Sequence, residues 1–170
     1  MTNKTIIKLL VLVFFTNSIL AQNGKLLHKE LVTLHDTLKQ RLSNVPNFQK
    51  IQDSTHLYKI TYESDGLKIN GYLATPKATG TYPVIIYNRG GNRDYSALND
   101  LNATYLLQNI AEWGYVVLAS NYREGGGSEG KEEFGGKDVN DVHNLVPLAA
   151  NLKKADTSSC LLYTSDAADD

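Results

Sequence analysis

The sequence predicts an α/β domain in which a β-hairpin precedes an alternation of buried strands and helices. Residues 57–64 and 67–76 alternate apolar and polar side chains on either side of a Ser-Asp-Gly turn, which is typical of a hairpin. Residues 83–88 and 115–120 are short, nearly continuous apolar runs, as expected for strands buried on both faces. Because a helical pattern follows each run, we expect a parallel sheet flanked by helices.

Residues 1–21 have the pattern of a secretory signal peptide. Lys4 and Lys8 supply positive charge, an apolar run surrounds Lys8, and Ala21 offers a small residue for cleavage. The run is shorter than the about 20 residues of a bilayer-spanning helix, so no stable membrane anchor is expected. We expect a mature chain that begins near Gln22 and a protein that is secreted or periplasmic.

Residues 22–56 are predicted to form an amphipathic helix and a connector. Leucines recur with helical spacing over 25–42, and Pro46 follows this pattern, as it does after many helices. The leucine stripe is expected to pack on the following domain, because it is short for a coiled coil. His28 and His35 are seven residues apart, so we expect exposed side chains rather than a metal pair.

Two further helices are predicted, over 98–113 and 137–154. Apolar side chains recur on one side of each segment. Gly114 is placed to end the first helix, and Pro147 is expected to bend or interrupt the second. The folded domain is therefore expected over 57–159.

The last segment, 160–170, resembles a translated sequencing adapter, and a disordered acidic tail is the alternative interpretation. Cys160 is the only cysteine of the chain and lies in this segment, so no disulfide and no thiolate metal site is expected in the rest. No metal site of another kind and no cofactor is predicted. The formal net charge of −1 at pH 7 becomes zero when 1–21 and 160–170 are set aside. A neutral chain gives no electrostatic reason to expect nucleic-acid binding.

Two catalytic patterns overlap in residues 125–131. One is G-x-S-x-G, in which Ser128 would be a nucleophile, and the other is most of the phosphate-binding G-x-x-x-x-G-K, which ends at Lys131. A nucleophile elbow needs a strand directly before it, but the predicted strand ends near Ser120. Glu132 stands where a phosphate loop needs Ser or Thr. Ser128 is therefore predicted not to be a nucleophile, and the glycines to serve a surface loop.

Four segments, in this order, resemble the α/β-hydrolase domain of prolyl oligopeptidase-like serine peptidases: SDGLKINGYLATP, YPVIIYNRGGNRDYS, LLQNIAEWGYVVLASNYREGGGSEG and EFGGKDVNDVHNLV. The resemblance covers residues 57–156. It implies the N-terminal half of an α/β-hydrolase sheet, with strand order 1-2-4-3-5, and an acyl-enzyme reaction on a peptide or ester substrate. Related esterases share this scaffold, so a carboxylesterase is the alternative.

The resemblance also implies part of a catalytic site. The turn after strand 83–88 corresponds to one side of the oxyanion hole and consists of Arg89, Gly90, Gly91 and Asn92. Glycine lets the backbone N–H groups approach a developing negative charge. Arg89 stands where relatives carry His or an aromatic residue, and it is expected either to donate to the oxyanion or to pair with an acid such as Asp94. Asp138 and Asp141 are expected to cap a helix or form salt bridges.

The catalytic triad of this family follows the fifth strand, in the chain order Ser, Asp, His. The resemblance therefore places all three residues beyond residue 159, and this chain is expected to stop before the nucleophile elbow. Without the fifth strand, strand 83–88 would be an exposed edge. A fragment with no activity of its own is thus the third interpretation.

Overall fold

The chain folds around one mixed β-sheet. The computed structural model describes residues 22–91 and 93–164. The strands are β1 (Leu26–Leu31), β2 (Thr55–Ser64), β3 (Leu67–Pro76), β4 (Tyr82–Asn88), β5 (Val116–Ser120) and β6 (Ala155–Thr164). Their order across the sheet is β1-β2-β3-β5-β4-β6. β4 pairs in parallel with both β5 and β6, and the remaining neighbours are antiparallel. From β2 onward this is the predicted order 1-2-4-3-5, with β1 added outside.

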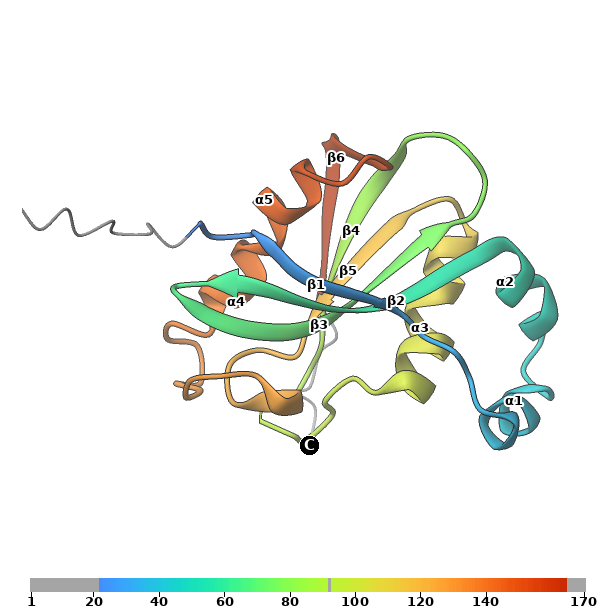
Figure 1. Ribbon diagram of the computed structural model, residues 1–170, viewed down its shortest axis with the longest axis horizontal. Coiled ribbons are helices and arrows are strands. Elements are labelled where there is room, and N and C mark those ends of the chain that lie inside the picture. Colours follow the sequence, from blue (N-terminus) through green and yellow to red (C-terminus); the bar gives the residue numbers. More distant parts are fainter. Residues whose placement is uncertain (1–21, 92, 165–170) are drawn as a thin grey trace, which may run out of the picture.

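Helices cover both faces of the sheet (Figure 1). α3 (Asp100–Glu112) packs on one face, and α4 (Val139–His143) and α5 (Leu145–Ala150) pack on the other. α1 (Asp36–Leu42) and α2 (Phe48–Ser54) precede β2, and α2 contacts α3. Placing the two crossovers on opposite faces follows from the right-handed connection of parallel strands.

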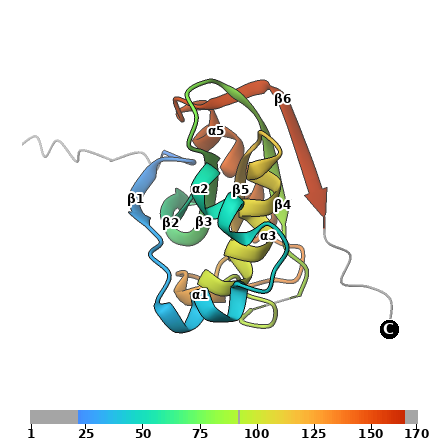
Figure 2. The same cartoon turned by 90° about the vertical axis from the view of Figure 1, so that its right-hand side faces the viewer.

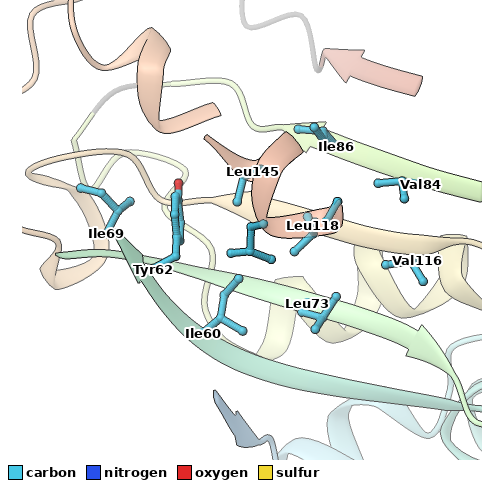
Figure 3. Packing of buried hydrophobic residues seen from close by; sticks show 11 residues of the cluster. Ile60, Tyr62, Ile69, Leu73, Val84, Ile86, Val116, Leu118 and Leu145 are labelled. Carbon is cyan, nitrogen blue, oxygen red and sulfur yellow. The ribbon is translucent and has the colours of Figure 1, made fainter. Parts of the chain in front are cut away.

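The sheet separates two hydrophobic clusters. Val116 and Leu118 of β5 point towards α5, whereas Val117 and Ala119 point towards α3. Figure 3 shows Leu145 of α5 above the sheet, among side chains from β2, β3, β4 and β5. All five residues of β5 are buried, which confirms the interpretation of its apolar run as a strand covered on both faces.

The predicted hairpin and first crossover helix are confirmed. β2 and β3 pair antiparallel, and the turn between them has Asp65 at φ 52° and Gly66 at φ 78°, as a type I′ turn requires. α3 begins with a capping box between Asn99 and Asn102. It ends before Gly114, which has φ 93°.

The continuous helix predicted over 25–42 is wrong. Its first part is β1, which pairs antiparallel with β2, and only its last part is helical, as α1. Leu27 and Leu31 are exposed in β1, whereas Leu34 and Leu42 are buried. The backbone groups on the outer edge of β2 provide long-range hydrogen bonds, and a short helix alone is too weak to compete with them. His28 lies in β1.

The helix predicted over 137–154 is interrupted, as its proline suggested. α4 ends at His143 and α5 begins at Leu145. Pro147 has no N–H to donate to the carbonyl of His143, four residues earlier, and its ring would clash with that carbonyl. Within α5 the proline lies in the first turn, where its missing N–H costs little.

The prediction of an exposed β4 edge is also wrong. β6 pairs in parallel with β4 along its length, from Tyr82 opposite Ala155 to Asn88 opposite Thr164. Residues 160–164, which were predicted to lie outside the folded domain, therefore belong to the sheet. β1 and β6 form its two edges (Figure 2). The predicted signal peptide, 1–21, and the end of the predicted tail, 165–170, lie outside the described residues.

A buried ion pair joins the hairpin, the end of β5 and α4. Arg123 and Asp141 have 4% and 0% of their side chains exposed, and Arg123 Nη2 lies 2.8 Å from Asp141 Oδ1. The same carboxylate accepts hydrogen bonds from the Nε and backbone N–H of Arg123 and from the hydroxyl of Ser64. Arg123 Nη2 also lies 3.0 Å from Asp65 Oδ2. Hydrogen bonding to the Asp141 carboxylate raises the pKa of Arg123, so the guanidinium stays charged.

The substitution Asp141→Asn is expected to reduce the free energy of unfolding by about 3–5 kcal/mol, because it leaves the Arg123 guanidinium buried beside a neutral group. Urea unfolding measures this loss. Asp36→Asn is the matched control: the Asp36 side chain is fully exposed beside Lys39, and no measurable loss is expected. Equal losses of stability for Asp141→Asn and Asp36→Asn would contradict the conclusion that the Arg123–Asp141 pair is a buried, stabilising interaction.

Candidate active site

The topology places a ligand site at the carboxyl ends of β4 and β5. From β4 the chain crosses through α3 to β5 on one side, and then through α4 and α5 to β6 on the other side of β4. Open α/β sheets bind ligands outside the carboxyl ends of strands at such a switch point. Two segments cover this position, the turn 89–96 after β4 and the loop 121–136 after β5.

The two glycines of the turn carry backbone donors with no acceptor in the part of the chain that the structure describes. Gly91 has φ 77°, and a Cβ at this position would lie only 2.6 Å from the carbonyl oxygen of Tyr95. Within the described residues, neither the N–H of Gly90 nor that of Gly91 donates to a protein acceptor. Two such groups at the end of a strand can stabilise a developing oxyanion. Asn92, the last member of the predicted set, lies outside the described residues.

Arg89 is buried beneath the turn, with 4% of its surface exposed. Nη1 donates to the carbonyl oxygens of Gly90 and Tyr95, at 3.2 and 3.0 Å, and Nη2 donates to those of Arg93 and Asn121, at 2.8 Å each. Its guanidinium carbon lies 4.4 Å from the centre of the Tyr122 ring. Burial lowers the pKa of Arg89 from its ordinary value. The side chain thus gathers four carbonyl groups and shapes the turn.

Two roles were predicted for Arg89, donation to the oxyanion and pairing with an acid such as Asp94. Its hydrogen bonds to described residues go to carbonyl groups, and Asp94 instead accepts from the N–H of Gly126, at 3.0 Å. Nε is the one nitrogen of the guanidinium with no described partner. A direct contribution of Arg89 to the oxyanion hole stays a prediction, whereas its support of the turn is seen directly.

Ser128 lies beside β3, in the loop after β5. Its hydroxyl oxygen accepts a hydrogen bond from the N–H of Asn70, at 3.0 Å, and Glu129 N donates to the carbonyl of Lys68, also at 3.0 Å. These two residues continue the β3 ladder beyond the end of β5. The next α-helix begins only at Val139, so the surroundings of Ser128 differ from the strand–turn–helix geometry of a nucleophile elbow.

The Lys131 side chain is 87% exposed and lies 3.8 Å from Glu124 Oε1. The glycines of the motif adopt the backbone expected of a surface loop, with φ of 57°, 76° and 90° at Gly126, Gly127 and Gly130. A lysine held beside a carboxylate in this way offers a poor site for a phosphate group.

Carboxylates bind the turn and the loop to each other. Glu132 accepts a hydrogen bond from the backbone N–H of Arg93, and Asp94 accepts from Gly126. Asp138 accepts hydrogen bonds from three backbone N–H groups of the loop, those of Glu133, Gly135 and Gly136. Burial acts to raise the pKa of Asp138, but these N–H groups hold it below its ordinary value. Asp141 forms the expected salt bridge, with Arg123, whereas Asp138 binds N–H groups of the loop and its side chain does not cap α4.

A cavity of about 820 Å³ opens beside the turn, between β4, β6 and α4. Apolar side chains line one part of it, including Ile86, Val142, Val146 and Leu162, and polar groups from Asn88, Tyr122 and Glu132 line the other. A site of this kind, apolar with a few placed polar groups, is typical of small-molecule binding.

The ranges that the structure describes contain neither a metal-binding cluster nor a membrane-spanning helix. No three His, Cys, Asp or Glu side chains there lie close enough to share a metal ion. None of the helices in those ranges combines the length and the apolar character that a bilayer crossing requires.

Sequence comparison identifies a bacterial relative. No protein-family model matches the chain. Over 110 residues it is 34% identical to a Bacillus subtilis (strain 168) protein described as an uncharacterized peptidase, YtmA. The match covers 63% of this chain and 41% of the relative, so the chain spans less than half of that protein.

Solved structures show the same fold. An acetyl xylan esterase from Paenibacillus sp. R4 superposes with a TM-score of 0.54 at 24% identity, over 84% of this chain and 47% of the esterase. The esterase Est22 superposes with a TM-score of 0.58 at 16% identity, over 78% of this chain and 47% of Est22. The strand order and these likenesses together define the chain as part of an α/β-hydrolase fold.

Sequence reasoning missed the residues that hold the turn in place. Tyr122 and Glu132 contact it from the loop, although neither belongs to a recognised catalytic pattern. The available signal was the position of Tyr122, two residues after a buried strand that ends next to β4. Side chains at that position face the switch point of the sheet.

The substitution Arg89→Lys is expected to reduce the free energy of unfolding by at least about 2 kcal/mol, because an ammonium group cannot replace donors to four separated carbonyl groups. Urea unfolding provides the measurement. Arg93→Lys, in the same turn but with its side chain 58% exposed, is the control and is expected to change stability by about 0.5 kcal/mol or less. Full retention of stability by Arg89→Lys would show that the positive charge, and not the hydrogen bonds to four carbonyl groups, stabilises the turn.

Proposed function

We propose that the chain is part of a secreted or periplasmic serine hydrolase, a prolyl oligopeptidase-like peptidase that acts through an acyl-enzyme. The observation that carries the proposal is the pair of N–H groups of Gly90 and Gly91 at the carboxyl end of β4, which have no acceptor among residues 22–91 and 93–164. The relative with the sequence match, described as a peptidase, supports a hydrolase of this kind.

The parallel strand arrangement supports the chemistry. β4 ends at Asn88, next to the turn that carries the glycines, and the carboxyl end of a parallel neighbour of β4 meets the same edge of the sheet. A serine placed there could attack a carbonyl carbon while the two N–H groups bind the resulting oxyanion. The bond to the leaving amine or alcohol then breaks, and water hydrolyses the acyl-enzyme.

The remaining parts of the proposal concern the ends of the chain and the substrate. Residues 1–21 are proposed to be a cleaved signal peptide, on their charge and apolar pattern. Residues 160–170 are proposed to stand in place of the native continuation, on their resemblance to adapter sequence. The chain by itself is then proposed to be inactive, with its triad in the missing continuation. An ester substrate is the alternative to a peptide.

Genomic sequence tests the proposal first. A G-x-S-x-G motif is expected within about 10 to 25 codons after codon 159, followed by an acid and then a histidine. Its absence there would overturn the proposal.

Labelling of the encoded full-length protein provides the second test. A fluorophosphonate probe, which reacts with activated serines, should label that protein and fail to label its Ser→Ala variant at the motif. Residues 22–164 alone are the control and should remain unlabelled. Hydrolysis of a proline-containing peptide anilide, compared with that of p-nitrophenyl acetate, distinguishes a peptidase from an esterase.

A further inference from the structure

We propose that Tyr122 is a positioning residue, whose hydroxyl fixes the direction of the Gly90 N–H in the oxyanion turn. The proposal rests on the function proposed above, since the N–H group has a catalytic role only in acyl transfer. The observations that support it are the hydrogen bonds of the phenol, the backbone conformation of Tyr122 and the geometry of the peptide group between Arg89 and Gly90.

The phenol binds two groups at the end of β4. Its oxygen lies 2.5 Å from the carbonyl oxygen of Arg89 and 2.5 Å from Oδ1 of Asn88. A phenol has one proton, so it cannot donate to two acceptors at once. The arrangement that satisfies both contacts turns the Asn88 amide, so that its NH₂ donates to the phenol and the phenol donates to Arg89 O.

The bond to Arg89 orients the neighbouring glycine. The carbonyl of Arg89 and the N–H of Gly90 belong to one planar trans peptide group, and they point in opposite directions. Holding the oxygen towards Tyr122 therefore holds the N–H away from it. Arg89 acts similarly on the next peptide group, because its Nη1 binds Gly90 O, whose peptide partner is Gly91 N–H.

The backbone of Tyr122 is strained to make this contact. Its φ is 58°, in the left-handed region that bulky residues seldom occupy. The residue is held there on both sides, since its own N–H donates to the Ser120 hydroxyl at 2.9 Å and the next N–H donates to Asp141. Strain of this kind persists only where surrounding contacts fix it, and it is commonly found at functional sites.

The protonation of the phenol suits the role. Burial raises the pKa of Tyr122 to about 12, with the nearby Arg89 acting in the opposite direction. The hydroxyl therefore keeps its proton at neutral pH and can donate continuously to Arg89 O.

The first test measures the geometry in the full 170-residue chain. Tyr122→Phe removes the hydroxyl and keeps the ring on Arg89, and Tyr72→Phe is the control, a buried tyrosine bonded to Asp100 on the other face. NMR residual dipolar couplings report N–H directions. The Gly90 coupling should fall towards zero in Tyr122→Phe and stay unchanged in Tyr72→Phe.

A second variant keeps this test decisive if Tyr122→Phe does not fold. Tyr122→Asn removes the phenol with a residue that tolerates the left-handed backbone conformation, and it should change the Gly90 coupling in the same direction. An unchanged Gly90 coupling in the folded variants would overturn the proposal, regardless of the activity measured for the full-length protein.

The second test uses the full-length protein, once fluorophosphonate labelling has shown an active serine. Tyr122→Phe should lower kcat by about 10- to 100-fold with KM unchanged, since a misdirected N–H loses part of one oxyanion-hole donor. Tyr72→Phe should leave kcat unchanged. An equal kcat for Tyr122→Phe and the wild type would contradict the proposal, whereas absence of labelling contradicts only the proposed function.

Discussion

The ion pair between Arg123 and Asp141 is the interaction on which the carboxyl-end loops depend. Taking both charges out of water is costly, and the pair persists because the guanidinium and the carboxylate are bound on several sides. It fixes the residue after Tyr122, so the strained backbone cannot relax towards solvent. The same pair ties α4 to the β2–β3 hairpin, which lies on the far side of β5 from β4. The ion pair and the hydrogen bonds around it therefore connect the antiparallel half of the sheet with the candidate active site.

Much of the sheet could be predicted, because local composition determines it. The runs 83–88 and 115–120 are apolar on both faces and became β4 and β5 within a residue or two. The errors lie in segments whose structure is determined by pairing with residues distant in the sequence. Residues 26–31 carry helical leucine spacing, yet they pair with β2, and no local pattern shows that this edge is available. Residues 160–164 were predicted to lie outside the folded domain, although LLYT is a good strand sequence and pairs with the open side of β4.

The candidate site was predictable only in part. Gly90 and Gly91 were identified through the family resemblance, and glycine is the residue that such a turn needs. The direction of the Arg89 side chain could not be predicted. A buried arginine that binds carbonyl groups looks the same in a sequence as an exposed one. Tyr122 was missed for a related reason: a left-handed conformation at an aromatic residue is imposed by tertiary contacts and leaves no mark on the pattern.

The carboxylate bonds between the turn 89–96 and the loop 121–136 have an evolutionary consequence. Glu132 binds the backbone N–H of Arg93, and Asp94 binds that of Gly126. The conformation of each segment therefore depends on side chains of the other. An insertion or deletion in one segment displaces the partners of the other. The two are thus expected to diverge together among homologues, and grafting them into a different hydrolase scaffold requires transferring both as one unit.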